Sequence, residues 1–309
     1  MYDVIIIGGG PAGLNAAMVL GRCRRRVLLF DTGKPRNRWS HSMNGFISRD
    51  GINPQEFLEL GRAELQKYKV EVVCKLVKTA TYSKGHFVVN DDEGTVYTSH
   101  KLLLATGLKD KLPNLPGLEE LYGKSVHHCQ YCDGWESRDK AIAVYGQGRR
   151  GVGQSLAMKT WSDSVTLYTD GTNKLTQSDW DKLKLNGIAV CTDKIARLEG
   201  EDGKLQRIVL QNGEVQEQQA MFFNTGTKQQ CDLGTQLGCE FTSKGVIKTR
   251  RLQKSNIPGL FVAGDAARDV QMVIVAAAEG MKAGVAINME LEQLYLKREP
   301  QAGNKPVAV

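Results

Sequence analysis

Short apolar runs that end near glycine recur along the chain. Residues 2–7 read YDVIII, which has the composition of a strand buried on both faces of a parallel sheet. Small residues at 14–21 then predict a helix, and residues 26–30 form a second apolar run that ends directly before Asp31. The order strand, loop, helix and strand predicts the βαβ unit of a nucleotide-binding fold.

The loop between the first strand and the helix, residues 8–13, reads GGGPAG and fits the pattern G-x-G-x-x-G. Its glycines permit a tight turn and close approach of a pyrophosphate, and the helix N-terminus that follows favours negative charge. An acid at the end of the second strand, 18 residues after Gly13, is suited to a ribose hydroxyl. Together these features predict an adenine dinucleotide site. Its predicted binding residues are Gly8, Gly10, Pro11, Ala12, Gly13 and Asp31.

The chain repeats this arrangement once. Residues 141–145 form another apolar strand, residues 146–151 read GQGRRG, and a helix is predicted to about residue 161. A strand at 165–169 then leads to Asp170, 19 residues after Gly151. The residues predicted to bind a second nucleotide are Gly146, Gly148, Gly151 and Asp170.

The repeat continues beyond these strands, because Thr225-Gly226 echoes Thr106-Gly107. An internal repeat of this kind predicts an α/β protein with two Rossmann-like domains, the second inserted into the first. We place the split first domain at residues 1–116 and 246–309, and the inserted domain at residues 117–245.

Two cysteines lie between the glycine loops, in the sequence Cys129-Gln130-Tyr131-Cys132-Asp133. Their spacing allows a small disulfide ring and commonly lowers the pKa of one thiol, and the adjacent acid can move the proton that exchange requires. Metal sites use the same spacing, but the other cysteines form no second C-x-x-C pair. The pattern favours a redox-active disulfide over a metal site or inert thiols. The adjacent His127 and His128 are open to a thiolate-tuning or a purely structural interpretation.

Composition sets outer limits on the function. With 309 residues, 41% of them hydrophobic and 24% charged, the chain has the make-up of a globular protein of about two domains. No apolar run reaches the roughly 18 residues of a membrane span, and the amino terminus lacks the pattern of a signal peptide. Seven cysteines are too few for a disulfide framework, so we expect a reducing, cytoplasmic location.

The formal net charge is +7, with arginines clustered at positions 22 and 24–26. This charge is compatible with a solvated basic face, with attraction of an anionic partner, and with peripheral contact at a membrane surface. No nucleic-acid recognition motif accompanies it, and we expect no nucleic-acid partner.

Over its whole length the chain resembles the low-molecular-weight thioredoxin reductases, which combine a split FAD domain with an inserted domain containing C-x-x-C-D-G. Residues 260–266, LFVAGDA, resemble the second flavin contact of two-dinucleotide flavoproteins, and residues 102–107, LLLATG, resemble their crossover strand. The resemblance implies FAD, a thioredoxin-like protein or small dithiol or disulfide as partner, and a homodimer formed through the FAD domain. It adds the cofactor-binding residues Thr32, Asn44, Ala105, Thr106, Gly107, Gly264 and Asp265.

The same resemblance assigns three catalytic roles. Cys132 is implied to be the thiol nearer the flavin, and Cys129 the interchange thiol that meets the substrate. Asp133 is implied to protonate or deprotonate the leaving sulfur. The direction of electron flow stays open, since the same parts reduce a disulfide or oxidise a dithiol.

The chain departs from thioredoxin reductases where they hold the 2′-phosphate of NADPH. That family has a His-Arg-Arg cluster after the second strand of the inserted domain, whereas residues 169–174 here read TDGTNK. An acid at Asp170 repels a 2′-phosphate and suits an unmodified ribose, which argues against NADPH. Two related groups lack this signature: oxygen-using dithiol oxidases, and diflavin-linked disulfide oxidoreductases of photosynthetic bacteria with a second FAD. Asp133 and Asp170 favour the diflavin group.

The sequence therefore predicts a flavin-dependent enzyme that exchanges electrons between FAD and the C-x-x-C pair. We expect it to work without NADPH, with a second FAD in the inserted domain, and to oxidise a dithiol partner. The second glycine loop is also compatible with NAD(H), with NADPH, or with no ligand at all. The alternative functions are an NADPH-dependent thioredoxin reductase, a dithiol oxidase and a flavin redox sensor.

Overall fold

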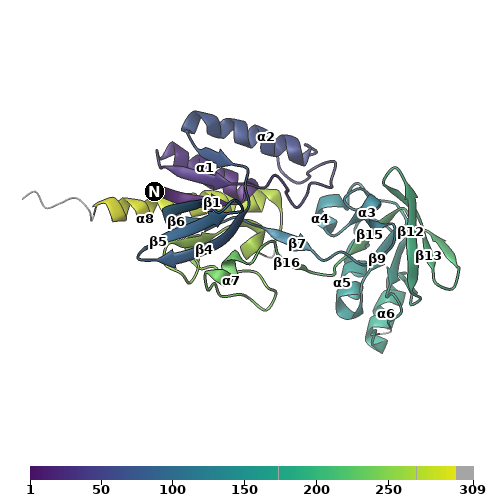
Figure 1. Ribbon diagram of the computed structural model, residues 1–309. Coiled ribbons are helices and arrows are strands. Elements are labelled where there is room, and N and C mark those ends of the chain that lie inside the picture. The colour runs from purple at the N-terminus through teal and green to yellow at the C-terminus, as the bar shows by residue number, and fades with distance from the viewer. Residues whose placement is uncertain (173, 269, 297–309) are drawn as a thin grey trace, which may run out of the picture. The chain divides into compact units, whose positions relative to one another are not determined.

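The computed structural model describes residues 1–172, 174–268 and 270–296, and these residues divide into two compact units (Figure 1). The first unit contains residues 1–36, 55–109 and the described residues from 228 onward. The second unit contains residues 37–54 and 110–227. The second unit is therefore formed mainly by a segment inserted between two parts of the first.

The first unit is built on a seven-stranded sheet. The strands in spatial order are β3 (Glu71–Val73), β2 (Val27–Phe30), β1 (Tyr2–Ile7), β6 (Val96–Leu104), β5 (His86–Asp91) and β4 (Val77–Ser83), with β17 (Leu260–Val262) also paired to β6. The strands from β3 to β6, together with β17, pair in parallel, whereas β4, β5 and β6 form an antiparallel meander. The parallel part has the alternation of strand and helix that a dinucleotide-binding fold requires.

Helices pack on both the parallel and the antiparallel parts of this sheet. They are α1 (Pro11–Arg22), α2 (Pro54–Leu65), the short α7 (Leu233–Gln236) and α8 (Val273–Leu296), with 3-10 turns η1 (Gln66–Tyr68), η2 (Arg251–Gln253) and η3 (Gly264–Ala267). The predicted start of the first helix at residue 14 was wrong, because α1 begins at Pro11. Proline is favoured at the first helical position, where its missing N–H has no intrahelical partner.

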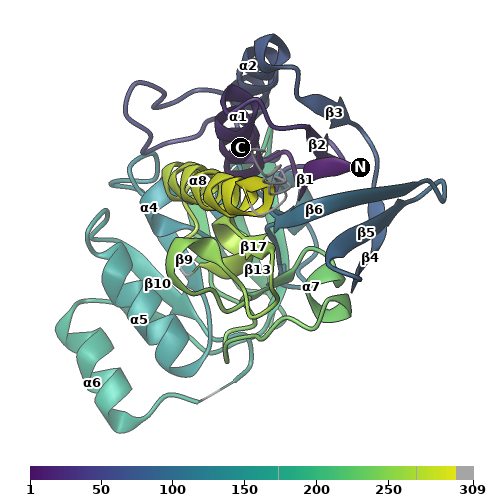
Figure 2. The same ribbon diagram turned by 90° about the vertical axis from the view of Figure 1, so that its left-hand side faces the viewer.

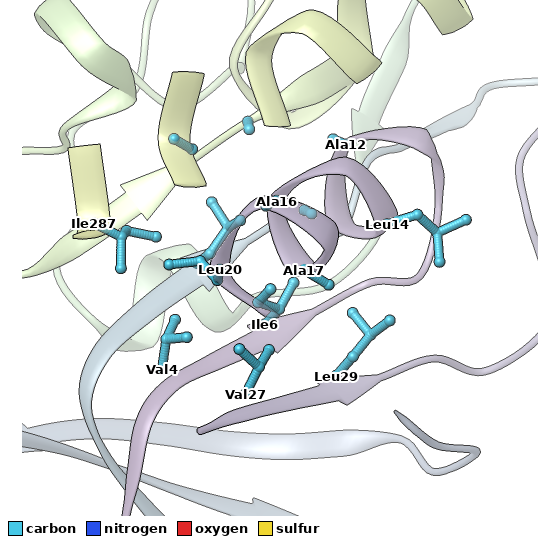
Figure 3. Close-up of a cluster of buried hydrophobic side chains, with 14 of the residues drawn as sticks. Val4, Ile6, Ala12, Leu14, Ala16, Ala17, Leu20, Val27, Leu29 and Ile287 are labelled. Atoms are coloured by element: carbon cyan, nitrogen blue, oxygen red, sulfur yellow. The ribbon is translucent and has the colours of Figure 1, made fainter. Parts of the chain in front are cut away.

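One of the two hydrophobic cores of the first unit lies between the sheet and α1. Figure 3 shows Val4, Ile6, Val27 and Leu29 from the strands packed beneath α1, with Ile287 of α8 beside them. Helix α8 packs along α1 (Figure 2), and small side chains on both helices permit this close contact. Burial of this apolar surface holds the glycine loop at the carboxyl end of β1.

The second unit repeats the parallel arrangement with five strands. Their order is β11 (Ala189–Cys191), β10 (Val165–Tyr168), β9 (Ile142–Tyr145), β15 (Ala220–Phe223) and β8 (Val126–His127). The accompanying helices are α3 (Leu118–Leu121), α4 (Gln130–Asp133), α5 (Gly148–Met158) and α6 (Gln177–Leu185). An antiparallel sheet of β12 (Ile195–Glu201), β13 (Lys204–Leu210) and β14 (Val215–Glu217) completes the unit. Two Rossmann-like units, one interrupted by the other, give the α/β fold that the sequence predicted.

Strand pairing makes the internal repeat explicit. Ile7 pairs with Leu104 in the first unit, and Tyr145 pairs with Phe223 in the second. Thr106-Gly107 and Thr225-Gly226 are therefore equivalent, since each pair follows its strand by the same number of residues. Both glycines have a left-handed backbone.

Two short connecting strands join the units. β7 (Leu108–Asp110) and β16 (Thr227–Gln229) form a two-stranded sheet, and the borders between units fall at residues 109/110 and 227/228. The sequence placed the domain boundaries at 116/117 and 245/246, and those boundaries stay a prediction.

Among the described residues, no helix has the length and apolar character that a membrane crossing would require.

Candidate active site and nucleotide loops

The first glycine loop turns between β1 and α1 without space for a side chain at Gly8, Gly9 or Gly13. A Cβ on Gly8 would lie 2.2 Å from the carbonyl oxygen of Ala105, and a Cβ on Gly13 would lie 1.8 Å from that of Gly8. A Cβ on Gly10, by contrast, would meet no atom within 4 Å. Backbone atoms thus exclude a side chain at Gly8 and Gly13, and the loop is open at Gly10, where a pyrophosphate would approach.

The N-terminus of α1 suits a phosphate. Gly10 is the N-cap residue, no side chain caps the helix, and the first turn contains no acid. The first N–H groups of a helix have no intrahelical partners, and the helix dipole favours an anion at this end. The residues present therefore fit the diphosphate of FAD, with Pro11, Ala12 and Gly13 forming the first turn.

The acids predicted to contact the cofactor are held by arginines that the sequence analysis did not identify. Arg62 Nη2 donates to Asp31 Oδ2 at 2.7 Å, and Arg36 Nη1 donates to Asp265 Oδ2 at 3.0 Å. Gly264, in a left-handed conformation, donates its backbone N–H to the buried Glu279 at 2.9 Å. Each ion pair joins residues far apart in the chain, so local sequence patterns carry no signal for it.

The remaining predicted flavin residues occupy two places. Thr32 is exposed directly after Asp31, and Ala105, Thr106 and Gly107 follow β6 within the first unit. Asn44 belongs instead to the second unit, where its side-chain Nδ2 donates to the carbonyl oxygen of Cys132 at 2.9 Å. The structure therefore assigns Asn44 a contact beside the cysteines, and its contact with flavin stays a prediction.

Cys129 and Cys132 are joined as a disulfide with Cα atoms 5.3 Å apart. Cys129 is the N-cap residue of the four-residue helix α4, and Cys132 lies within that helix. The i, i+3 spacing on one helical turn brings the two sulfurs together. Among the residues that the structure describes, no group of three or more His, Cys, Asp or Glu side chains is arranged to hold a metal ion.

Asp133 follows Cys132 directly in the sequence, and its side chain is 17% exposed. Burial, with a smaller contribution from the charge of Glu136, raises the pKa of its carboxyl to about 7. Its Oδ1 lies 3.3 Å from Nδ1 of His127 on β8. Burial lowers the pKa of His127 to about 3, so this ring is neutral at physiological pH. A neutral imidazole facing a carboxyl that titrates near neutrality forms a site that can hold one proton beside Cys132.

The sequence left two interpretations of His127 open, a thiolate-tuning role and a purely structural one. In the fold its buried ring lies beside the carboxyl of Asp133. His128, on the other side of the backbone, contacts Tyr122 instead, with Nδ1 3.2 Å from the phenolic oxygen. The two adjacent histidines therefore face different groups, as expected for consecutive residues in extended backbone.

Exposed aromatic side chains flank the disulfide. Tyr131, between the two cysteines, is 71% exposed, and Trp135, just beyond α4, is 65% exposed. Cζ of Arg138 lies 4.2 Å from the ring centroid of Trp135, and Nη1 of Arg138 donates to the Trp135 carbonyl oxygen. Large aromatic groups held at a surface in this way are typical anchors for a binding partner.

The second glycine loop shares the close packing of its first and last glycines with the first loop. A Cβ on Gly151 would lie 2.7 Å from the carbonyl group of Gly146, so these two glycines pack together as Gly8 and Gly13 do. Gly148 has a left-handed backbone, and a Cβ there would meet only the carbonyl oxygen of Lys174, at 3.8 Å. Helix α5 also begins without a side-chain cap or an acid in its first turn. The described part of this loop therefore fits a dinucleotide phosphate.

The position of Asp170 differs from that of Asp31. Phe30 pairs with Ile7, and Tyr168 pairs with Tyr145, so the residue equivalent to Asp31 is Thr169. The prediction that Asp170 ends the strand was wrong, because β10 ends at Tyr168. The hydroxyl oxygen of Thr169 is buried and has no hydrogen-bond partner among the described residues.

Asp170 is held in a left-handed backbone conformation just beyond this point. Its Oδ2 accepts a hydrogen bond from the Tyr145 hydroxyl at 2.8 Å, and its Oδ1 accepts one from the backbone N–H of Ile195 at 3.0 Å. The carboxylate is thus fixed in place by two donors of its own unit. An ionised carboxylate has further lone pairs, so these bonds leave acceptor capacity for a ribose hydroxyl.

Two arginines of the cluster at positions 22 and 24–26 form hydrogen bonds within the first unit. Arg22 Nη1 donates to the hydroxyl of Tyr68 at 2.8 Å, and Arg25 Nε donates to Oδ1 of Asn288 at 2.7 Å. These contacts give two of the arginines structural roles.

Comparison with known proteins identifies the family. Residues 2–280 match the family model described as pyridine nucleotide-disulphide oxidoreductase. The chain belongs to this family. It is 32% identical to a probable thioredoxin reductase of Arthroderma benhamiae, in an alignment that covers 94% of this chain and 81% of the relative. This oxidoreductase is accordingly a thioredoxin reductase-like, FAD-dependent enzyme.

Solved structures show the same fold over nearly the whole oxidoreductase. A putative thioredoxin reductase, TrxB, from Bacillus anthracis is 34% identical, with a TM-score of 0.91, and the match covers 96% of this chain and all of that one. HlmI is 35% identical, also with a TM-score of 0.91, and the match covers 96% of this chain and 94% of HlmI. When bound at the first glycine loop, FAD supplies two-electron redox chemistry that the side chains lack.

Proposed function

We propose that this oxidoreductase works without NADPH and oxidises a dithiol partner through Cys129 and Cys132. The observation that carries the proposal is the fixed carboxylate of Asp170, held by Tyr145 and Ile195 where thioredoxin reductases are expected to have arginines. A 2′-phosphate bound at this strand end would face that negative charge. Because two hydrogen bonds hold the carboxylate, it cannot move away at little cost.

Reduction of the flavin by NADPH tests this proposal. When oxidised protein and NADPH are mixed anaerobically, we expect the flavin absorbance band to stay largely unchanged for seconds, because the 2′-phosphate lacks a cationic clamp at Asp170. Dithiothreitol, added to the same sample, should bleach the band. Rapid bleaching at micromolar NADPH would contradict the proposal and would favour a clamp formed by Arg149 and Arg150, which are exposed in the first turn of α5.

We further propose that the second glycine loop binds another FAD, as in the diflavin-linked group that the sequence resembles. Three features support this assignment: the close packing of Gly146 and Gly151, the open space beside Gly148, and the uncapped start of α5. The ribose of FAD carries no 2′-phosphate, so the charge of Asp170 does not oppose it.

The number of flavins released on denaturation measures the occupancy of the second loop. We expect about two flavins per chain in the parent and about one in Gly148→Asn, because the new side chain fills the phosphate approach. Asparagine tolerates the left-handed backbone at this position better than most residues do. Gly153→Asn, in the same helix with open space around it, is the matched control. One flavin per chain in parent protein saturated with FAD would overturn the assignment.

The partner that this proposal requires is a thioredoxin-like protein or a small dithiol in a reducing, cytoplasmic environment. The exposed rings of Tyr131 and Trp135 beside the disulfide support a partner large enough to contact both. Such rings are typical energetic centres of protein interfaces.

We also propose a homodimer formed through α8. Five apolar residues spaced 7, 4, 4 and 7 apart lie on its exposed face, each between 37% and 71% exposed: Ile274, Met281, Val285, Met289 and Leu296. The opposite face packs against α1. An apolar stripe along a 24-residue helix matches the surface of a second copy, since self-association buries the same stripe on both chains.

Light scattering coupled to size exclusion measures this association. Val285→Glu is expected to convert a dimer into a monomer, because it places a charge at the centre of the apolar stripe. Leu185→Glu is the control, since Leu185 is exposed on α6 of the other unit. A monomeric parent, or a Val285→Glu variant that stays dimeric, would exclude α8 as the interface.

A further inference from the structure

A buried carboxylate on α8 joins three segments of the first unit. Glu279 is 6% exposed, and its Oε2 accepts a hydrogen bond from the backbone N–H of Gly264 at 2.9 Å. Its Oε1 accepts a hydrogen bond from Nε of Arg268, and Nε2 of Gln253 lies 3.4 Å from the same oxygen. Gly264 begins η3, Arg268 directly follows it, and Gln253 belongs to η2. One side chain therefore ties η2 and both ends of η3 to α8.

The η3 turn lies beside the start of α1. A Cβ on Gly264 would be 3.1 Å from the Cβ of Ala12, and a Cβ on Gly280 would be 1.9 Å from the Ala12 carbonyl oxygen. Ala12 belongs to the first turn of α1, whose N–H groups suit the diphosphate of FAD. Gly280 directly follows Glu279 in the sequence. Both η3 and the part of α8 next to Glu279 therefore pack against the helix start where the cofactor phosphates are expected.

The η2 segment reaches Glu279 through an uncommon backbone conformation. Leu252 and Gln253 have φ angles of 62° and 59°, in the left-handed region that residues other than glycine rarely adopt. Gln253 is only 3% exposed. Backbone strain of this kind persists where surrounding contacts impose it, and it is concentrated at sites that bind ligands. The left-handed pair therefore supports a functional reason for the contacts around Glu279.

We propose that Glu279 is a positioning residue for FAD, which holds η3 in the conformation that lets Asp265 contact the cofactor. A carboxylate has two acceptor oxygens, and here one serves the N–H at the start of η3 and the other the guanidinium at its end. Asp265 lies between these two points, and Arg36 holds its carboxylate from another segment. The proposal concerns the first FAD, and it depends neither on NADPH nor on the direction of electron flow.

Glu279→Gln isolates this role, because glutamine has the shape of glutamate but only one acceptor oxygen. Its NH2 group would face either the N–H of Gly264 or the guanidinium of Arg268, so one end of η3 would lose its partner. The other end would keep its hydrogen bond. We expect the dissociation constant of FAD to rise about tenfold, the usual effect of losing one hydrogen bond to a charged group.

Dilution of the holoenzyme followed by ultrafiltration measures this constant, with free FAD quantified by its fluorescence. Every variant also carries Gly148→Asn, which limits FAD binding to the first loop. Glu290→Gln is the matched control, because Glu290 pairs with Lys101 and Lys254 and lies 11 residues further along α8, roughly 16 Å from Glu279. Both changes remove a carboxylate from α8 and should lower the melting temperature, but only Glu279→Gln should weaken FAD binding. Unchanged FAD affinity in Glu279→Gln, or an equal loss in the control, would overturn the proposal.

A double-mutant cycle tests whether Glu279 acts through Asp265. The loss of FAD affinity caused by Glu279→Gln should largely disappear in an Asp265→Asn background, whereas the fall in melting temperature should stay. Additive losses of affinity would overturn the proposal. If Glu279→Gln does not fold, Arg268→Gln takes its place, since the Arg268 side chain is 36% exposed and supplies only the second end of η3. It should raise the dissociation constant in the same Asp265-dependent way, and an unchanged constant would contradict the proposal.

Discussion

Replacing Cys132 by serine is expected to abolish oxidation of a dithiol by this oxidoreductase. A serine hydroxyl cannot form the disulfide with Cys129 through which the proposed electrons pass, so no alternative route remains among the groups of the site. In an anaerobic dithionite titration, the parent should take up one pair of electrons more than its bound flavin accounts for. The Cys129→Ser, Cys132→Ser variant should lack this extra pair.

Cys74→Ser is the matched control for this experiment, because Cys74 is an exposed thiol outside the disulfide. It should leave both the titration and the turnover unchanged. A double-serine variant that titrates like the parent would show that the cysteine pair is not a redox centre. Turnover that survives in Cys132→Ser would show that the partner is oxidised elsewhere.

Asp133→Asn is expected to slow opening of the disulfide by roughly 10²-fold, the usual scale of general acid–base catalysis. Burial raises the pKa of the Asp133 carboxyl to about 7, so its proton is present below that pH and is lost as the pH rises through it. The contribution of this acid should therefore decline above about pH 7. An asparagine amide has no such proton to give to the departing thiolate of Cys132.

The measurement is the rate of disulfide reduction between pH 5.5 and 9, on the order of two units either side of the shifted pKa. The ratio of parent to Asp133→Asn rates removes the titration of the reductant, and it should fall as the pH rises through about 7. Glu136→Gln is the informative control, because the charge of Glu136 helps to raise the pKa of Asp133. It should move the decline to lower pH. A ratio that does not change with pH would exclude Asp133 as the acid.

Local patterns in the sequence determined the nucleotide-binding character of this protein. The glycines of residues 8–13 and 146–151 stand directly between an apolar strand and a helix, and this spacing is set by covalent geometry within one βαβ unit. The C-x-x-C pair is local in the same sense, because three positions on one helical turn bring the sulfurs together. Both glycine loops and the cysteine pair could therefore be predicted from the sequence alone.

The tertiary structure decided which polar groups act together. Asp170 appeared to end its strand, but pairing of Tyr168 with Tyr145 shows that Thr169 holds the position equivalent to Asp31. Register depends on hydrogen bonds to a neighbouring strand, and those bonds have no local signature.

Burial and long-range contacts completed the site in the same way. His127 and Asp133 lie 3.3 Å apart, and burial shifts their pKa values in opposite directions. The contacts of Glu279 join η2 and η3 to α8. The sequence by itself determined the reactive groups and the nucleotide loops. Only the fold decided where their protons reside, because solvent exclusion and contacts between distant segments set proton affinities.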